Sequence, residues 1–489
     1  MSVLLLVLTA CTTPSAESSR SAASAIPCEP LGDGLDTGAL ATSSTAAGDT
    51  ATRAAGLGLC VEQDPAAPLV IRVKWSTDEP GTSEVTFSEP GGPSWRIADP
   101  RLTREHVVAL YGLHPETEVG FDVLSVLEGG GEVRVEGLTA RTGSVPEWVP
   151  EAEVLVHDSE RVQPGWTLLN LSNRDADWPP TSVAYDADGR PVWFRVTDTN
   201  EDHRGDLDVS LTPDGHVLVG GSGADIRALE VAWDGSVVWV GPEQEPLVHH
   251  HHVEKLADGT YVMLRHVRDG GGDALLDRIV RYDSEHRVVW DWDPFDHLVL
   301  PDPVPNDWLH ANAVTVTEER VWLSCRNLDQ ILGIEPESGD VVEVIGRGGD
   351  HALAGGRWFA GQHDPELQPD GSWLLYDNQG LSGRHSRVMR LTAAEGAAEV
   401  VWEFPGDAAQ PDPWYAEDWY SSIWGDADAL PNGNVLVAAG TREEGRESRV
   451  FEVEPVTNEV VWSVRWPASP GIVGVYRAER IDVPLERVR

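Results

Sequence analysis

The chain has 489 residues, of which 41% are hydrophobic, and 81 acidic against 36 basic residues give it a formal net charge of −45. The apolar share is large enough for a sizeable core, which excludes a wholly disordered chain. A surface this acidic repels phosphate backbones, which excludes nucleic acid as a partner. The 20 tryptophans outnumber the 8 tyrosines and 7 phenylalanines combined, and this excess predicts a packing role that recurs along the chain.

The N-terminal segment, residues 1–11, is apolar and ends in Leu8, Thr9, Ala10 and Cys11. Small residues before a cysteine that follows an apolar stretch resemble the lipobox of bacterial lipoproteins, and the resemblance implies cleavage before Cys11 and lipidation of its thiol. An ordinary signal peptide with a chance cysteine is the alternative. No apolar run approaches the roughly 20 residues that span a bilayer. We therefore expect an exported protein of the periplasm or cell envelope, held at the membrane by a lipid anchor only.

Residues 12–65 are predicted to form a low-complexity tether, because much of this stretch is rich in Ser, Ala, Thr and Gly. Cys28 and Cys60 bracket the tract and could pair in an oxidising compartment. Cys325 lies in an apolar strand pattern and is predicted to be a buried free thiol. No zinc-finger spacing and no phosphate-binding Gly-x-x-x-x-Gly-Lys-Ser/Thr motif occurs, so neither a metal nor another cofactor is predicted.

Residues 66–145 alternate apolar and polar positions in short runs separated by Gly, Pro and Asp clusters, a pattern typical of a small all-β domain. Every second residue from Leu113 to Val123 resembles the fibronectin type III signature, with Val119 where tyrosine is usual. The resemblance implies a β-sandwich that serves as a spacer or docking module. Nothing in this segment suggests chemistry.

From residue 150 to 480 the chain repeats a polar turn followed by an apolar strand, and each unit ends in a further apolar strand. That last strand is marked in the six successive units by Trp193, Trp239, Trp290, Val344, Trp402 and Trp462. Each unit has room for about four short strands, so the repeats predict an all-β, six-bladed β-propeller. A solenoid is the alternative, but it would need shorter and more uniform repeats.

Three histidines recur at one distance from the turn of their unit. Each lies eight residues before a turn residue: His251 before Gly259, His310 before Glu318 and His363 before Gly371. The pattern predicts one shared position in the first strand of three consecutive blades, which lines the central channel of a propeller. Asn312 is expected to point to the same side as His310 because side chains alternate along a strand. The run His249–His252 leaves open which histidine faces the channel, since a bulge would substitute His250 or His252 for His251.

The second strand of these units adds further polar residues at a common position. Counting five residues from Tyr261, Val321 and Trp373 gives His266, Arg326 and Asn378. A neutral histidine is a nucleophile and an acid–base group near neutral pH, and the planar fork of an arginine suits phosphate-like or sulfate-like oxyanions. The set therefore predicts the transfer of a small anionic group.

Four segments carry a resemblance to a known family. They are Asp307–Asn312, Ser324–Ile331, Gln362–Asp364 and Leu430–Asn434, and in this order they resemble the bacterial arylsulfate sulfotransferases over roughly residues 150–480. The resemblance implies a six-bladed propeller with a smaller N-terminal β-domain. It also implies transfer of a sulfuryl group from a phenolic sulfate ester to a phenolic acceptor, through a sulfohistidine and without a nucleotide donor.

Carried over residue by residue, the resemblance makes His363 the nucleophile and places His310 and Arg326 on the sulfuryl oxygens. Asn312 would help to orient these oxygens, and His251 would exchange protons with the phenol oxygens. Asn378 and His266 would line the same substrate site. Two other functions remain open: a non-catalytic propeller that binds a carbohydrate or a partner, and a metal-dependent hydrolase that uses the three channel histidines as a facial set.

Overall fold

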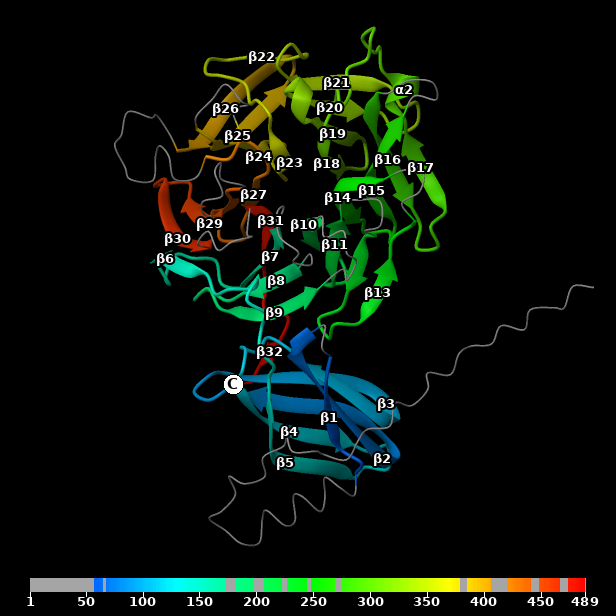
Figure 1. Cartoon of the computed structure of the whole chain (residues 1–489), viewed down its shortest axis with the longest axis vertical. Helices are drawn as coiled ribbons and strands as arrows, with labels where there is room; N and C mark the ends of the chain where they lie inside the picture. Colours follow the sequence, from blue (N-terminus) through cyan, green and yellow to red (C-terminus); the bar gives the residue numbers. More distant parts are fainter. Residues whose placement is uncertain are drawn as a thin grey trace, which may run out of the picture.

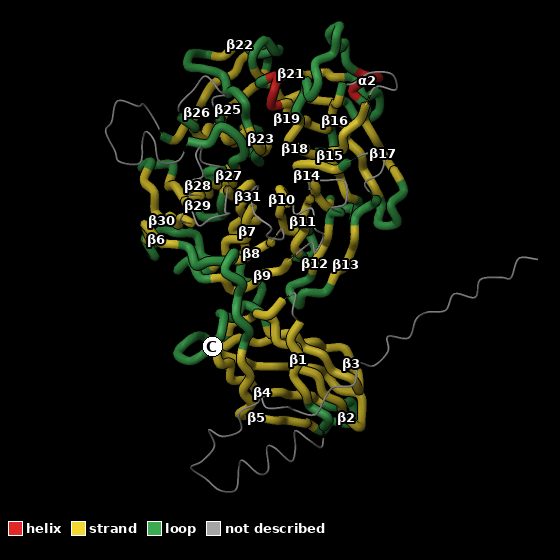
Figure 2. Tube along the Cα trace, in the orientation of Figure 1, coloured by secondary structure: helices red, strands yellow, loops and turns green. Residues whose placement is uncertain are grey.

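The computed structural model describes the chain from Leu57 onward, with gaps. The described residues are 57–64, 67–172, 181–196, 206–221, 227–243, 248–268, 274–378, 385–405, 420–440, 448–466 and 474–488. Within these ranges the chain is almost entirely strand and turn, with one short α-helix, α2 (Pro294–His297), and one 3-10 helix, η2 (Arg326–Leu328), as Figure 2 shows. No helix in this part of the chain is long and apolar enough to cross a membrane.

Six antiparallel sheets are arranged around a common channel, so the larger domain is a six-bladed β-propeller (Figure 1). From the channel outward, blade one contains β31 (Gly474–Ile481), β7 (Trp166–Ser172), β8 (Thr181–Tyr185) and β9 (Pro191–Val196). Blade two contains β10 (Asp206–Leu211), β11 (Val217–Gly221), β12 (Leu229–Val231) and β13 (Val237–Val240). Blade three contains β14 (His249–Lys255), β15 (Tyr261–Arg268), β16 (Leu275–Tyr282) and β17 (Val288–Trp292).

The other three blades follow the same plan. Blade four contains β18 (Ala311–Val316), β19 (Val321–Cys325), β20 (Gln330–Ile334) and β21 (Val341–Gly346). Blade five contains β23 (His363–Leu367), β24 (Trp373–Asp377), β25 (Arg387–Ala394) and β26 (Ala397–Phe404), with the short β22 (Ala352–Leu353) beside β26. Blade six contains β27 (Asp426–Ala429), β28 (Val435–Ala438), β29 (Ser448–Glu454), β30 (Glu459–Trp466) and, outermost, β6 (Glu153–His157).

Both ends of the propeller sequence close the ring. Strand β31, from the C-terminal end, pairs with β7 and becomes the innermost strand of blade one. Strand β6, from the N-terminal end, pairs with β30 at the outer edge of blade six. Two separate pairings therefore close the ring between the first and last blades. The residues of β31 reach the channel although they lie far in the sequence from the other three strands of blade one.

The marker tryptophans join each blade to the next. Five indole N–H groups donate, over 2.8 to 3.3 Å, to the turn between the third and fourth strands of the following blade: Trp193 to Trp233, Trp239 to Ser284, Trp290 to Pro336, Trp402 to Asn458 and Trp462 to Ala187. The last of these contacts crosses from blade six to blade one. Hydrophobic clusters fill the interfaces between neighbouring blades, so the tryptophan excess has the recurring packing role that the sequence predicts.

The smaller domain is a β-structure with its own apolar core (Figure 1). It contains β1 (Cys60–Asp64), β2 (Ala67–Ser88), β3 (Ser94–Leu110), β4 (Glu118–Val126) and β5 (Glu132–Arg141). The sheet runs in the order β32, β3, β2, β4, β5, with β1 beside β2, and β32 (Glu486–Arg487) comes from the C-terminus. Strand β1 lies within residues 12–65, so the tether is shorter than the sequence predicts. The fibronectin type III likeness stays a prediction.

The cysteines are only partly covered by the described residues. Cys325 is buried and is a free thiol, as the apolar pattern around it predicts. Cys60 takes part in a disulfide bond. Cys11 and Cys28 lie outside the described residues, and so do the predicted lipobox and most of the tether.

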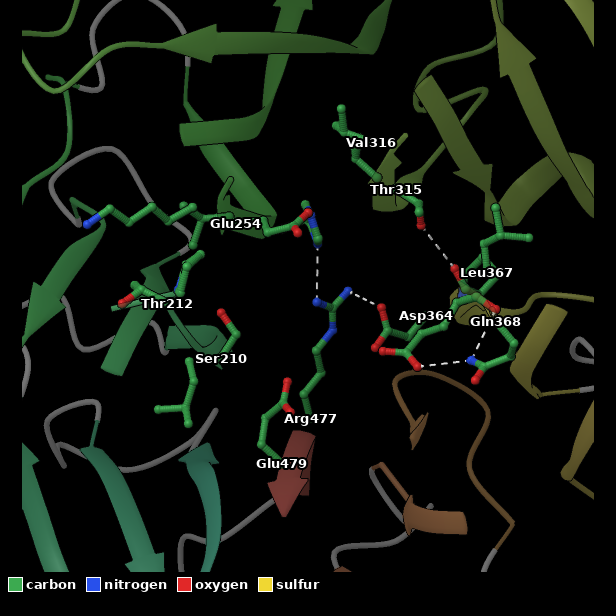
Figure 3. A pocket seen from close by; sticks show the side chains of 18 residues that line it. Ser210, Thr212, Glu254, Thr315, Val316, Asp364, Leu367, Gln368, Arg477 and Glu479 are labelled. Atoms are coloured by element: carbon green, nitrogen blue, oxygen red, sulfur yellow. Dashed lines mark hydrogen bonds and ion pairs between the residues drawn. The ribbon is translucent and has the colours of Figure 1, made fainter. Parts of the chain in front are cut away.

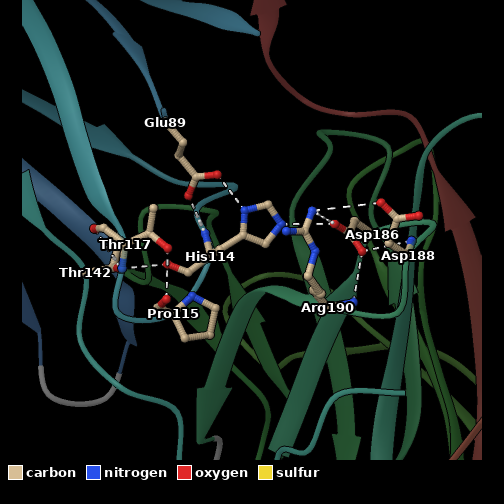
Figure 4. Close-up of polar contacts among 8 residues, drawn as sticks. All are labelled: Glu89, His114, Pro115, Thr117, Thr142, Asp186, Asp188 and Arg190. Carbon is tan, nitrogen blue, oxygen red and sulfur yellow. Dashed lines mark hydrogen bonds and ion pairs between the residues drawn. The ribbon is translucent and has the colours of Figure 1, made fainter. Parts of the chain in front are cut away.

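A histidine connects the two domains (Figure 4). His114 of the smaller domain contacts Glu89 of the same domain through Nδ1 at 2.5 Å and Asp186 of the propeller through Nε2 at 3.0 Å. Burial opposes the charge on this imidazole, but the hydrogen bonds to Asp186 and Glu89 raise the pKa of His114 to about 9. A charged imidazole between two carboxylates therefore fixes how the smaller domain sits on the propeller. Arg72 adds a second contact by donating to the carbonyl of Asp234 at 2.8 Å.

Candidate active site

The innermost strands of four blades begin with an unusual backbone conformation. His251, His310, Asp364 and Trp424 have φ values of 57°, 47°, 47° and 66°, in the left-handed region that non-glycine residues rarely adopt. They lie where the chain enters β14, β18, β23 and β27. Strained residues of this kind cluster at functional sites, where the surrounding structure holds them. The strain marks one end of the channel as the candidate site.

The predicted common position of the three histidines is wrong for His310. His251 and His363 each lie four residues before the end of their strand, at Lys255 and Leu367, whereas His310 lies six residues before Val316. The reason is the turn residue used for the alignment: Glu318 is the second residue of the turn 317–320, whereas Gly259 and Gly371 are the fourth residues of the turns 256–260 and 368–372. Alignment on the turn therefore displaced the fourth unit by two residues, and Asn312 occupies the position that matches the other two histidines.

A bulge in β14 directs its histidines to different partners. His249 pairs with Arg265 and Val253 pairs with Met263, so the pairing register shifts between these two positions. The ring of His251 lies 5.2 Å from the ring of His310, which places His251 in the site. The sequence left this choice open.

His363 is held in one tautomer. Its Nδ1 lies 2.8 Å from Asn378 Oδ1 and 3.2 Å from the carbonyl of Gly361, and both of these atoms only accept hydrogen bonds. The amide of Asn378 cannot be reversed, because its Nδ2 donates to the carbonyls of Ser421 and Trp424 at 2.9 and 2.7 Å. The proton of a neutral His363 therefore sits on Nδ1, and the lone pair is on Nε2.

The ionisation of His363 suits a nucleophile. Its side chain is buried, and burial together with the charge of Arg326 lowers the pKa of His363 to about 3. The ring is therefore neutral at physiological pH, with a lone pair available on Nε2. The backbone N–H of Trp424 donates to this Nε2 at 3.2 Å.

Arg326 has one buried side-chain donor without a hydrogen-bond partner among the described residues. It begins η2 directly after β19, and its backbone N–H donates to the carbonyl of His310. The guanidinium donates to Asn327 Oδ1 at 2.9 Å and to the carbonyl of Ser422 at 3.4 Å, but its Nε is buried without a hydrogen-bond partner. A buried donor without a partner is costly, and an oxyanion at this place would satisfy it.

His310 is oriented by an acidic residue to which sequence reasoning gave no role. Its Nδ1 lies 2.6 Å from Asp307 Oδ2, so Nδ1 carries a proton and Nε2 is left for the site. The side chain of His310 is 28% exposed, enough for a small substrate to reach it. Asp307 would also stabilise the positive charge that develops when Nε2 takes up a proton.

His251 contacts a second buried network. Its Nδ1 lies 2.8 Å from Nδ1 of His250, and Asp277 lies behind, 3.2 Å from His250 Nε2 and 3.3 Å from His266 Nδ1. Burial lowers the pKa of His250 to about 4, so this ring is neutral. The rings of His250 and His266 are stacked at 3.9 Å and 15°, and one ion cannot lie in the planes of two parallel rings. His266 therefore supports His250 from behind, and its predicted place in the substrate site stays a prediction.

Tyr476 is a site residue that the sequence did not reveal. It lies on β31, and its ring centre is 5.9 Å from that of His251, 6.2 Å from that of His363 and 6.0 Å from that of Trp424. Burial raises the pKa of Tyr476 above its usual value, so the hydroxyl stays protonated. The repeats could not identify this residue, because β31 follows the last complete unit. A search for a closing strand after blade six would have found it.

The two asparagines have positioning contacts. Asn378 fixes the tautomer of His363, as described above. Asn312 is fully buried, and its Nδ2 donates at 2.7 Å to the carbonyl of Gln362, the residue before His363. Asn312 therefore holds the entry of β23, and the predicted contact of its side chain with a sulfuryl oxygen stays a prediction.

Comparisons with known proteins agree with this geometry in one respect. The family model described as Arylsulfotransferase (ASST) matches residues 152–477. No curated protein matches the chain. A protein of unknown function from Bacteroides caccae has 13% identity and a TM-score of 0.45, and the alignment covers 64% of this chain and 100% of that one. The β-propeller domain of Cps50 (Swd1) from Myceliophteria thermophila has 11% identity and a TM-score of 0.32, with 62% and 87% covered. Similarity this low carries no argument about function.

Proposed function

Because the arylsulfotransferase match spans residues 152–477, this chain belongs to the arylsulfotransferase family and is an arylsulfate sulfotransferase, and we propose that it transfers the sulfuryl group through His363. The donor is a phenolic sulfate ester and the acceptor is a phenol. The observation that carries the proposal is the fixed tautomer of His363, with the proton on Nδ1 held by Asn378 and the lone pair on Nε2.

In the first half-reaction, His363 Nε2 attacks the sulfur of the donor ester. The N–S bond forms as the bond between sulfur and the phenol oxygen breaks, and the lone pair of Nε2 supplies the electrons. The departing phenolate is basic, with a pKa of about 10 in water, so a positioned proton donor speeds its departure. The products are a sulfohistidine and the first phenol.

Charge on the sulfuryl oxygens is met by donors around His363. Arg326 offers its buried Nε, for which the described part of the chain supplies no hydrogen-bond partner. The N–H of Trp424 hydrogen-bonds Nε2 of the free enzyme, and this bond is released when Nε2 attacks. The same N–H is then next to the new N–S bond, where it can donate to a sulfuryl oxygen.

Proton transfer is assigned to His310 and His251. Asp307 holds His310 with Nε2 available and stabilises its protonated form, so His310 suits the donation of a proton to the leaving phenolate. Burial and the neighbouring His250 and His310 hold the pKa of His251 well below its usual value, so His251 is neutral and can pass a proton on to His310 without keeping it. In the second half-reaction the oxygen of the acceptor phenol attacks sulfur as the bond between sulfur and His363 Nε2 breaks, and the acceptor's proton returns to His310 Nε2, which gave up a proton in the first half-reaction.

The alternative of a metal-dependent hydrolase has less support. Two groups of described residues bring three potential ligand atoms within 4.8 Å of one another, and neither contains His251, His310 or His363. The positive charge of the half-buried Arg326 also disfavours a cation beside these histidines.

We also propose that the protein is exported and anchored to the cell envelope by a lipid on Cys11. The support is the lipobox-like sequence and the tether that follows it. Growth with radiolabelled palmitate tests the proposal: the wild-type chain should carry label, and Cys11→Ala should not.

Steady-state kinetics test the catalytic proposal. With para-nitrophenyl sulfate as the donor, an added phenol should raise the rate of nitrophenol release, and parallel lines in double-reciprocal plots should indicate two half-reactions. His363→Asn should abolish release, whereas His297→Asn, a histidine in α2 outside the site, should leave it unchanged. Intersecting lines, or activity retained by His363→Asn, would contradict the proposal.

A further inference from the structure

The opposite end of the channel is acidic. A cavity of about 510 Å³ lies there, lined by residues of β10, β14, β18, β23 and β31, five of the six innermost strands (Figure 3). Its acidic lining residues are Glu254, Asp364, Glu366 and Glu479. Asp364 directly follows His363, so the cavity and the histidine site lie on the two sides of one short stretch of backbone.

The basic residues of this cavity already have carboxylate partners. Arg477 lies 2.9 Å from Asp208 Oδ1 through Nη1 and 2.6 Å from Asp364 Oδ1 through Nη2. Lys255 lies 2.6 Å from Asp214 and 3.0 Å from Glu230. The two strongly basic residues of the cavity are thus each shared by two carboxylates.

Several other carboxylates at this end have no basic partner. Among the described residues, no basic side chain forms an ion pair with any of the following four: Glu366, Asp426, Asp428 and Glu479. The largest charges that act on Asp428 come from other carboxylates, namely Asp426, Glu479, Glu366 and Asp364. Like charges that are close and shielded from water repel one another strongly, so the cluster calls for a positive ion.

Three of these carboxylates converge. Asp364, Glu366 and Asp428 each offer one ligand oxygen, and the three oxygens lie within 4.8 Å of one another. Asp428 is 8% exposed, and its Oδ2 is buried with no hydrogen-bond partner within the described ranges. A buried carboxylate oxygen without a donor or a cation is rare, because its desolvation is not offset. This atom is the independent sign of a missing ligand.

We propose that Asp364, Glu366 and Asp428 bind a calcium ion in the channel. All three ligands are hard carboxylate oxygens, without the imidazoles or thiolates that zinc and copper prefer. Calcium binds 6–8 oxygens at about 2.3–2.6 Å, so oxygens on opposite sides of the ion are about 5 Å apart, which fits the observed spacing. The adjoining cavity has room for water molecules to complete the shell. The ion would join β23 of blade five to β27 of blade six.

Calcium binding to the whole chain tests the proposal directly. Protein treated with a chelator and then desalted should bind one calcium ion per chain in equilibrium dialysis, and its Tm should rise with calcium concentration. Asp428→Asn should lose both effects. In the absence of calcium this variant should melt no lower than the wild type, because it removes repulsion, which separates lost binding from lost folding. Glu319→Gln, which removes an exposed carboxylate from the turn after β18, should bind as the wild type does.

Two results would overturn the proposal. The wild-type chain could bind no calcium at millimolar concentration, which would mean that protons neutralise the cluster. Alternatively, Asp428→Asn and Glu366→Gln could both bind calcium as tightly as the wild type, which would place the ion elsewhere. Neither measurement uses sulfuryl transfer, so the outcome is independent of the catalytic proposal.

Discussion

Replacement of Asn378 by alanine tests how strongly the catalytic rate depends on the tautomer of His363. The Nδ1 proton of His363 has two acceptors, Asn378 Oδ1 at 2.8 Å and the carbonyl of Gly361 at 3.2 Å. The alanine variant loses the nearer one and leaves a buried N–H with only the longer contact. It also removes the two bonds that Asn378 donates to Ser421 and Trp424.

The expected decrease in kcat/KM follows from the free energy that the lost hydrogen bond to His363 Nδ1 costs. A buried donor that loses its partner costs about 1–3 kcal/mol. If this energy is what favours the tautomer with a lone pair on Nε2, then kcat/KM should fall by about 5–150-fold, since about 1.4 kcal/mol corresponds to a factor of ten. Most of the decrease should appear in kcat, because the tautomer affects the attack more than the binding of the donor.

The assay is initial-rate release of nitrophenol from para-nitrophenyl sulfate at saturating phenol. Asn458→Ala is the matched control, because Asn458 accepts the indole N–H of Trp402 far from the site. This control should lower Tm and leave kcat/KM unchanged. If Asn378→Ala keeps kcat/KM within about twofold of the wild type while it lowers Tm, the reasoning about the tautomer is refuted.

Three further predictions concern other contacts. Asp307→Asn should lower kcat by about 10- to 100-fold with little change in Tm, because His310 loses the carboxylate that stabilises its protonated form. Trp402→Phe should reduce the free energy of unfolding by about 1 kcal/mol in urea titrations, because one hydrogen bond between blades five and six is lost. For His114, the raised pKa adds stability that is fully present below about pH 6.5 and is lost as the pH rises through about 9, so the Tm of the wild type should approach that of His114→Gln over this window.

A specific result would contradict each of these three predictions. An Asp307→Asn enzyme with wild-type kcat would remove His310 from proton transfer. A Trp402→Phe protein as stable as the wild type would mean that packing alone joins the two blades. A constant difference in Tm between the wild type and His114→Gln from pH 6 to pH 10 would show that the imidazole does not bear the charge.

The six-bladed architecture could be predicted from the sequence because the same sequence pattern recurs in each blade. A polar turn and a closing strand recur in every unit, and the tryptophans mark where a blade meets the next. Strand β32 could not be predicted, because it is short and pairs with β3, far away in the sequence, and β1 was missed because it directly follows the low-complexity stretch. The position of His310 was misassigned because the turn 317–320 contains no glycine to mark the alignment, and Glu318 is the second residue of that turn and not the fourth.

The site was readable where residue types are rare and not where they are common. The 16 histidines stand out in a chain of this composition, and the repeats predicted that His251, His363, Arg326 and Asn378 would meet. Asp307 and Asp277 did not stand out among 81 acidic residues, although their contacts orient two histidines. Tyr476 was missed because ring closure brings it to the channel from the far end of the sequence.

The covalent intermediate is the central claim and can be measured directly. The enzyme is mixed with para-nitrophenyl sulfate without an acceptor and quenched under alkaline conditions, because the N–S bond of a sulfohistidine is labile to acid. The protein is then digested and analysed by mass spectrometry. The account predicts the mass of one added sulfuryl group on the peptide that contains His363, its disappearance when a phenol is added before the quench, and its absence from His363→Asn. Turnover without any adduct, or an adduct on His251 or His310 in place of His363, would contradict it.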